Sequence, residues 1–105
     1  MFSIIYTTTD SDQEAEKISK ELLEKRLVAC ANIFPINSLY WWQGKIERSG
    51  EVAVIFKTRT ELLDSAIEAI RQLHSYEVPC IVAYEMTTGH QAYLDWIETE
   101  TGKEG

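Results

Sequence analysis

The sequence predicts an α+β fold, a two-layer sandwich with the element order βαββαβ and an additional C-terminal helix. Four apolar, β-prone runs and two stretches with helical periodicity alternate in this order. The chain has 105 residues, of which 45% are hydrophobic and 26% charged, which is the composition of an ordinary globular protein. No linker or low-complexity segment divides it, so we expect a single domain over residues 1–105.

The first strand and the first helix are indicated by local pattern. Residues 2–9 form an apolar and β-branched run that ends in three threonines, which is typical of a strand. Ser11 then stands three residues before Glu14, the spacing of a capping box, and apolar residues follow at helical intervals. We therefore expect a helix from about Asp12 to Arg26.

Two further strands are expected to form a long hairpin. Residues 28–42 are apolar and β-prone but contain Pro35, which predicts a long, bent strand with Pro35 at an edge or bulge. A turn is expected at Gly44, followed by a further extended stretch from Ile46. Its centre, residues 51–58, holds five consecutive apolar residues and forms the heart of the third strand.

The last elements complete the pattern. We expect Thr60 to cap a second helix with one apolar face, over residues 63–73. A loop from His74 to Pro79, a fourth strand from Cys80 to Met86, and a short helix from Gln91 to about Thr99 follow. This order suggests a split βαβ, ferredoxin-like sandwich, in which two helices cover one face of a four-stranded antiparallel sheet.

The strands carry more apolar residues than one covered face needs. In an isolated sandwich the second face meets water, so apolar and polar residues should alternate. Instead, residues 4–6, 52–56 and 81–84 are apolar at successive positions, and therefore on both faces of their strands. Large exposed apolar patches mark interfaces, so we expect copies of the chain to cover the open face of the sheet in a homo-oligomer.

Three successive aromatic residues support this expectation. Tyr40, Trp41 and Trp42 must point to alternate sides of their strand, so at least one points away from the helices of its own chain. Large aromatic side chains are typical interface anchors. We therefore expect Trp41 and Trp42 to pack at a subunit interface.

Charge and cysteine content exclude several classes. The formal charge of −7 and the lack of basic clusters argue against nucleic acid and anionic membranes as partners. No secretory or membrane-spanning segment is visible, so a cytoplasmic location is expected. Cys30 and Cys80 lie fifty residues apart, which fits neither a disulfide framework nor a zinc ribbon.

Five blocks in register resemble the CutA divalent-cation tolerance family, over essentially the whole chain. The blocks are Leu27-Val28-Ala29-Cys30-Ala31-Asn32, Tyr40-Trp41-Trp42-Gln43-Gly44-Lys45, Phe56-Lys57-Thr58, His74-Ser75-Tyr76-Glu77-Val78-Pro79 and Tyr93-Leu94-Asp95-Trp96-Ile97. The resemblance implies a subunit similar to those of the PII signalling proteins, assembled as a tight homotrimer. It also implies a role in tolerance of copper and other divalent cations, with metal binding and no established catalysis, in a mostly cytoplasmic family.

Three side chains could carry metal chemistry. Cys30 offers a soft thiolate suited to copper(I) or zinc, His74 an imidazole, and Glu77 a carboxylate three residues further on. The resemblance maps the proposed ligand cysteine of the family onto Cys30 and its loop histidine onto His74. Ser75 stands where the family usually has proline, and Cys80 is not a usual family ligand. We expect copper or another divalent cation to bind here, with ligands gathered within one chain or across a subunit boundary.

Structural alternatives exist for the same residues. Cys30 lies between two alanines in an apolar strand, where a cysteine is often only a small buried residue. His74 could instead hydrogen-bond the end of the second helix. Lys57 is flanked by apolar residues and must either extend its amine to solvent or pair with an acid such as Glu51 or Glu47.

Two function classes other than metal binding are catalysis and effector binding. Catalysis is disfavoured, because no glycine-rich phosphate loop, nucleophile elbow or paired histidine and acid motif occurs. An effector-binding or signalling module is the main alternative. In that case clefts between subunits near Tyr40, Lys57 and Tyr76 would hold a small anion or metabolite.

Overall fold

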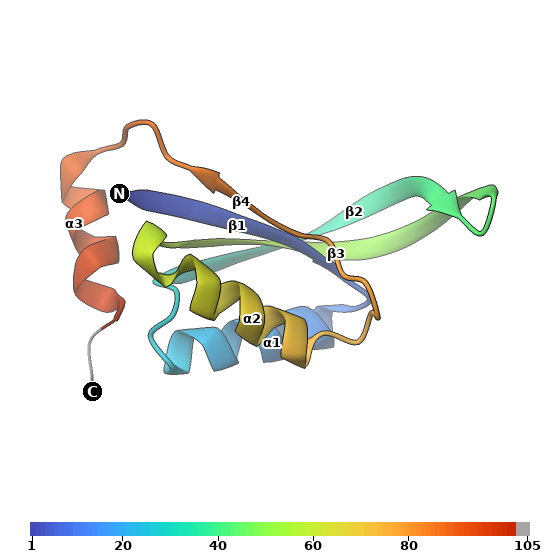
Figure 1. Ribbon diagram of the computed structural model, residues 1–105, viewed down its shortest axis with the longest axis horizontal. Coiled ribbons are helices and arrows are strands. Elements are labelled where there is room, and N and C mark those ends of the chain that lie inside the picture. Colours follow the sequence, from blue (N-terminus) through green and yellow to red (C-terminus); the bar gives the residue numbers. More distant parts are fainter. Residues whose placement is uncertain (103–105) are drawn as a thin grey trace.

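The computed structural model describes residues 1–102 and shows a four-stranded antiparallel sheet in the order β2-β3-β1-β4 (Figure 1). Helices α1 and α2 cover one face of this sheet. The predicted α+β class and element order are confirmed, while residues 103–105 of the predicted domain lie outside the described part. The elements are β1 (Phe2–Thr9), α1 (Asp12–Glu24), β2 (Cys30–Trp42), β3 (Lys45–Arg59), a 3-10 turn (Thr60–Leu62), α2 (Leu63–Leu73), β4 (Ile81–Glu85) and α3 (Gln91–Glu100).

Helix α1 ends earlier than the sequence predicted. It stops at Glu24 and not at Arg26, because Arg26 adopts a left-handed backbone with φ of 60°. The N–H of Leu27 then donates to the carbonyl of Leu22 at 2.9 Å, which closes the last turn of the helix. The reversal directs the chain into β2.

The β2–β3 hairpin is the longest feature of the molecule. Its strands pair from Cys30 opposite Lys57 out to Trp42 opposite Lys45, and the predicted turn is confirmed with Gln43 and Gly44 at φ of 50° and 80°. Pro35 lies on the outer strand of the sheet, as expected for a residue without an N–H. The hairpin tip projects beyond the helices (Figure 1), and the molecule measures 45 × 27 × 21 Å.

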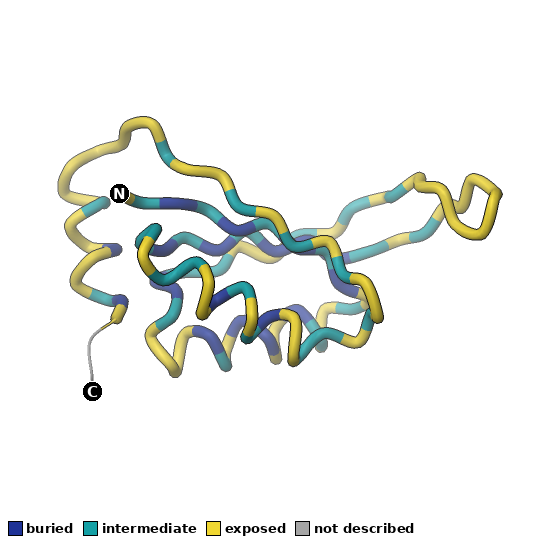
Figure 2. Tube along the Cα trace, viewed as in Figure 1, coloured by how far each residue is buried: buried dark blue, intermediate teal, exposed yellow. Residues whose placement is uncertain are grey.

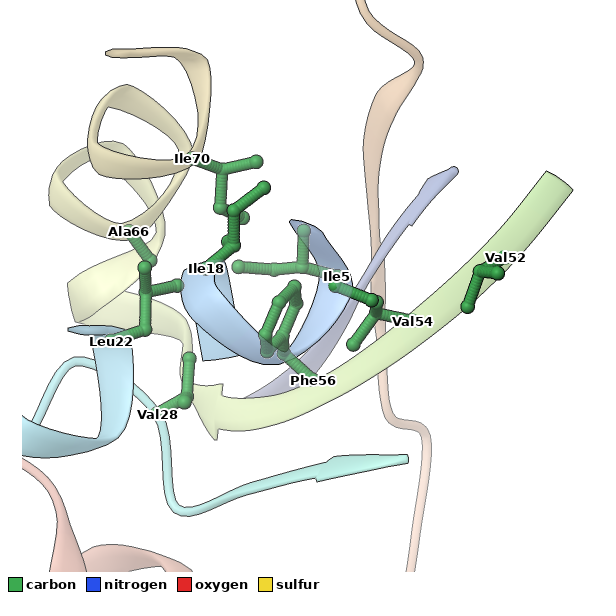
Figure 3. Close-up of a cluster of buried hydrophobic side chains, with 10 residues drawn as sticks. Ile5, Ile18, Leu22, Val28, Val52, Val54, Phe56, Ala66 and Ile70 are labelled. Carbon is green, nitrogen blue, oxygen red and sulfur yellow. The ribbon is translucent and has the colours of Figure 1, made fainter. Parts of the chain in front are cut away.

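The hydrophobic core lies between the sheet and helices α1 and α2 (Figure 3). Ile5 and Phe56 oppose each other on β1 and β3 and point to this side. Ile18, Leu22 and Ile70 from the two helices pack against them, and all five side chains are fully buried. The apolar stripes that predicted the two helices are therefore the faces that form the core.

The predicted cap of the second helix is wrong. Residues 60–62 form a 3-10 turn, and α2 begins at Leu63 without a side-chain cap. The Thr60 hydroxyl instead lies 2.8 Å from the hydroxyl of Ser3, on the neighbouring strand β1. A long-range contact has replaced the local one, because β3 ends beside the start of β1.

The opposite face of the sheet is only partly covered in one chain. Ile4 and Tyr6 of β1 are half-buried there, while Val82 and Tyr84 of β4 are 40% and 59% exposed. Figure 2 shows the contrast between this region and the dark-blue core. One chain therefore buries only the helix side of the sheet, and the expected cover of the open face by further copies stays a prediction. No helix within residues 1–102 is both long enough and apolar enough to cross a membrane.

Candidate functional site

The candidate residues fall into two groups on different parts of the sheet. Cys30 and Lys57 pair where β2 begins, at the level where β3 pairs Lys57 with Ile4 of β1. The loop of residues 74–79 instead contacts the far end of β1, at Thr8. One chain therefore does not bring Cys30 together with the loop.

Four side chains form the first group, which we call the Cys30 cluster: Cys30, Asn32, Lys57 and Tyr93. The Cys30 Sγ lies 3.8 Å from Oδ1 of Asn32 and 3.8 Å from the hydroxyl oxygen of Tyr93. The Lys57 amine donates to the same Asn32 oxygen at 3.0 Å and lies 5.6 Å from the centre of the Tyr93 ring. The cluster thus surrounds a free, half-buried thiol with two oxygens and one ammonium group.

The phenol of Tyr93 stays protonated in this setting. Burial and the contact with Cys30 raise the pKa of Tyr93, and these effects outweigh the opposing influence of Lys57. Its ring also stacks on Trp96, with ring centres 5.5 Å apart. Of the two alternatives for Lys57, the pairing with Glu51 or Glu47 is not found, because the Lys57 amine bonds to the Asn32 amide on the neighbouring strand.

His74 is held by the backbone on both sides of its ring. The side chain is fully buried, and Nε2 lies 2.7 Å from the carbonyl oxygen of Thr8, to which it must donate. Nδ1 accepts the N–H of Tyr76 at 3.1 Å. The ring is therefore the neutral tautomer with its proton on Nε2. The ring bonds to β1, and not to the end of α2 as the structural alternative for His74 expected.

Glu14 of α1 joins the loop to the helix. Its carboxylate accepts the N–H of Asp10 at 3.0 Å and the N–H of Ser75 at 2.6 Å, and lies 3.7 Å from Nδ1 of His74. Burial alone would raise the pKa of Glu14, but the hydrogen bonds from Asp10 and Ser75 outweigh it, so the pKa lies below its usual value. The charged carboxylate is therefore part of the loop anchor.

Tyr76 ties the other side of the loop to β3. Its hydroxyl donates to Oε2 of Glu51 at 2.7 Å, and burial together with this carboxylate raises the pKa of Tyr76 well above its ordinary value. Glu77 is exposed, beside these anchored residues. Burial and the Glu51 carboxylate also raise the pKa of the neighbouring Cys80 thiol.

The expected ligand set is therefore not assembled within one chain. No group of three or more histidine, cysteine, aspartate and glutamate side chains gathers at metal-binding distance among residues 1–102. Tyr40, Trp41 and Trp42 lie on the projecting hairpin, where the Tyr40 hydroxyl is 3.3 Å from that of Ser49. A ligand set shared between subunits stays a prediction.

Several side chains of these two groups were not singled out from the sequence. Asn32 and Tyr93 complete the Cys30 cluster, and Glu14 anchors the loop. Asn32 could have been found from the sequence, since it follows Cys30 by two residues and must share its face of the strand. The contacts of Tyr93 and Glu14 depend on how helices pack on the sheet, which no local pattern gives.

The chain was compared with known proteins. The family described as CutA1 divalent ion tolerance protein matches residues 3–100. A divalent-cation tolerance protein CutA from Archaeoglobus fulgidus is 49% identical over 98 residues, which cover 93% of this chain and 96% of the relative. Its counterpart from Pyrococcus horikoshii is 44% identical over 100 residues, 95% of this chain and 98% of that protein.

Solved structures agree with these matches. The structure described as the periplasmic divalent cation tolerance protein CutA from Archaeoglobus fulgidus has a TM-score of 0.93 at 48% identity, covering 95% of this chain and 98% of that chain. The divalent cation tolerance protein from Thermus thermophilus has a TM-score of 0.93 at 39% identity, covering 97% and 100%. The resemblance of the five sequence blocks is thereby confirmed: the chain belongs to the CutA1 divalent ion tolerance protein family.

Proposed function

We propose that this protein contributes to divalent-cation tolerance as a homotrimer that binds copper or another divalent metal ion, with the Cys30 thiolate as a ligand. The observation that carries the proposal is the environment of Cys30. Its thiol is free and half-buried, and has two oxygen atoms 3.8 Å from Sγ. The names of the relatives, divalent-cation tolerance proteins, supply the biological context. The role proposed is binding and not catalysis.

The donor set fits a partial metal site. The Cys30 thiolate is a soft ligand for copper(I) or zinc, whereas the Asn32 and Tyr93 oxygens are neutral and weaker. Lys57 places a positive charge beside Asn32, which opposes a cation at that oxygen. One chain therefore offers one strong ligand, and further ligands must come from a neighbouring subunit.

The 74–79 loop is the proposed source of the second ligand. Glu77 is exposed and offers a carboxylate, while His74 and Tyr76 hold the loop against β1 and β3. For His74 itself to bind a metal, its ring would have to give up one of its two hydrogen bonds. We therefore propose Glu77 as the ligand from this loop, with His74 fixing the loop that carries it.

The trimer is supported by the apolar surface of the hairpin and the open sheet face. Leu39, Trp41 and Trp42 are 72%, 73% and 59% exposed in one chain, and Ile46 is 65% exposed. A folded monomer rarely leaves such residues in water, so copies of the chain are the simplest cover. Sedimentation at micromolar concentration should give the trimer mass, and a monomer mass would contradict this part of the proposal.

Calorimetry with copper and zinc tests the metal site. The wild type should bind metal stoichiometrically, Cys30→Ser should lose this binding, and Cys80→Ser should keep it. Cys80→Ser is a matched control, because it also removes one free thiol. Unchanged binding by Cys30→Ser would rule out the thiolate as a ligand.

An effector-binding role is the alternative, and one observation favours it. Lys57 has no carboxylate partner within residues 1–102, and its amine lies over the Tyr93 ring. A positive group beside an aromatic ring suits a small anion or metabolite. Tyr40 lies near the hairpin tip, at the other end of β2 from Cys30, and Tyr76 lies in the 74–79 loop, so both would join such a site from neighbouring subunits. A ligand-library thermal shift abolished by Lys57→Ala would support this role, and a shift that persists would oppose it.

We propose a cytoplasmic location, because the family that the sequence blocks resemble is mostly cytoplasmic. A solved relative from Archaeoglobus fulgidus is described as periplasmic. Fractionation of cells that produce the protein at its natural level distinguishes the two locations. Recovery outside the cytoplasmic fraction would overturn the proposal.

A further inference from the structure

We propose that α3 is a lid over the Cys30 thiol, held shut by a polar latch at its C-terminal end, so that local opening of α3 controls access to Cys30. Any role of this lid in metal binding rests on the proposed function. The lid itself involves only the Cys30 thiol and the helix that contacts it.

The lid meets the thiol through one side chain. The hydroxyl of Tyr93, on the first turn of α3, lies 3.8 Å from the Cys30 Sγ, and its ring packs beside the Lys57 amine. Asn32 is the other hydrogen-bonding neighbour of this thiol. If α3 moved away from the sheet, Cys30 would therefore lose one of its two neighbours and become more accessible.

The latch joins the far end of α3 to β3. Nε of Arg59 donates to Oγ1 of Thr101 at 3.0 Å, and Nη2 donates to the Thr101 carbonyl at 3.3 Å. Thr101 is fully buried, and its hydroxyl donates to the carbonyl of Ile97 at 2.8 Å. The hydroxyl of Thr101 thus accepts a hydrogen bond from Arg59 and donates one to the last turn of α3.

A second set of bonds joins the same end of α3 to the turn after α1. The N–H of Gly102 donates to the carbonyl of Arg26 at 2.8 Å, and the Arg26 guanidinium lies 2.8 Å from Oε1 of Glu100. Gly102 has a φ of 70°, and a Cβ at this position would overlap the Arg59 guanidinium. The close approach that the latch needs therefore depends on a glycine.

Apart from the latch, α3 is weakly attached. Ile97 is its only fully buried side chain, while Tyr93 and Trp96 are 38% and 41% exposed. Residues 86–90 connect β4 to α3. Met86 bonds to the carbonyl of Phe2, but residues 87–90 are all exposed, and the helix begins without a side-chain cap. Elements with few buried apolar contacts open before the rest of a fold. Figure 1 shows α3 at the end of the sheet, separate from the α1 and α2 layer.

Thiol reactivity tests the lid directly. In a Cys80→Ser background Cys30 is the single thiol, and its rate of reaction with 5,5′-dithiobis(2-nitrobenzoic acid) reports its accessibility. Thr101→Val keeps the shape of the side chain but removes the hydroxyl that accepts from Nε of Arg59, while the carbonyl that accepts from Nη2 remains. We expect it to accelerate the reaction about fivefold or more, the factor expected for loss of one hydrogen bond.

Thr99→Val is the matched control. Thr99 is exposed on the same helix, and its hydroxyl bonds only to the carbonyl of Asp95 within α3. Its reaction rate should stay at the parent value. Equal rates for the parent, Thr101→Val and Thr99→Val would overturn the latch. Equal acceleration by both variants would overturn it as well, since the effect would then follow helix stability and not the Arg59 contact.

Two further measurements separate the possible failures. Denaturant should accelerate the reaction of Thr101→Val only weakly if α3 opens locally, because the slope scales with the surface exposed. A slope equal to that of global unfolding would overturn the lid.

Tyr93→Ala leaves the latch intact and should also accelerate the reaction, whereas an unchanged rate would show that α3 does not cover the thiol. If calorimetry finds no metal on the parent while these rates respond as expected, the proposed function fails and the lid stands.

Discussion

The imidazole of His74 donates from Nε2 to the Thr8 carbonyl at 2.7 Å and accepts the N–H of Tyr76 on Nδ1 at 3.1 Å. These two bonds connect the end of α2, the C-terminal end of β1 and the loop that carries Glu77. They make His74 a structural residue in a single chain. The direct consequence is a stability effect that an exposed histidine would not have.

His74→Ala should lower the free energy of unfolding by about 2 kcal/mol, because a partly buried carbonyl and a partly buried N–H both lose their partner. Denaturant unfolding measures this change. His90→Ala is the matched control, since His90 is exposed and makes no side-chain cap of α3, and its effect should stay within about 0.5 kcal/mol. Equal effects of the two substitutions would show that the His74 bonds contribute nothing.

Glu14 should make stability depend on pH in acid. Its pKa is lower in the folded state than the ordinary 4.5, so its contribution is complete above about pH 4.5 and is lost as the pH falls through the lowered folded value. At neutral pH, Glu14→Gln should lower the free energy of unfolding by about 1.5–3 kcal/mol, the range for hydrogen bonds to a charged group. The difference from wild type should shrink as the pH is lowered.

Unfolding curves between pH 3 and pH 7 measure this effect. Glu16→Gln, at an exposed position on the same helix, controls for the loss of one negative charge. A constant difference between wild type and Glu14→Gln over the whole range would contradict the assignment, as would the same pH dependence in Glu16→Gln.

The hairpin turn should be sensitive at one glycine and not at the other. Gly44 has a φ of 80°, whereas Gly50 has no left-handed backbone and open space around its missing Cβ. Gly44→Ala should therefore cost about 1–2 kcal/mol, the penalty for a left-handed residue with a Cβ. Gly50→Ala should cost less, and thermal unfolding compares the two. The same loss at both positions would argue against the turn conformation.

The hairpin aromatics should matter for assembly more than for folding of the chain. Trp41 and Trp42 lie far from the core and are largely exposed in one chain, so their replacement by serine should leave the circular dichroism spectrum unchanged. Sedimentation should show a shift from trimer towards monomer. Lys45→Ser, also exposed at the tip, should keep the trimer. A trimer that survives the double tryptophan substitution would remove these residues from the proposed interface.

Local pattern predicted the elements of the fold well. The Ser11 cap is confirmed by its bond from the N–H of Glu14 at 3.1 Å, and the turn at Gly44 lies where the sequence placed it. Both signals act within a few residues along the chain. The apolar stripes also predicted the core-facing sides of α1 and α2 correctly, because burial in the core requires them.

The errors occurred where distant segments meet. Thr60 contacts Ser3 instead of capping α2, and Lys57 bonds Asn32, a partner that neither alternative for Lys57 included. Glu51, one of the acids considered for Lys57, accepts from Tyr76. The partner of each of these polar groups depends on how distant segments come together in the fold. A single sequence does not show this arrangement.

The candidate site was predictable as a set of residue types but not as an arrangement. Soft-ligand chemistry and the family blocks singled out Cys30, yet its contact with Tyr93 depends on the position of α3 on the sheet. The separation of Cys30 from His74 and Glu77 within one chain likewise follows from topology. A site completed by a neighbouring subunit is the form of the prediction that agrees with this geometry.

The most direct test of the account is a crystal structure of the protein with copper, examined by anomalous scattering at the copper edge. We expect a trimer with a copper peak at bonding distance from the Sγ of Cys30 and a Glu77 carboxylate of a neighbouring subunit beside it. A copper peak elsewhere, with the Cys30 thiol free at full metal occupancy, would contradict the central claim.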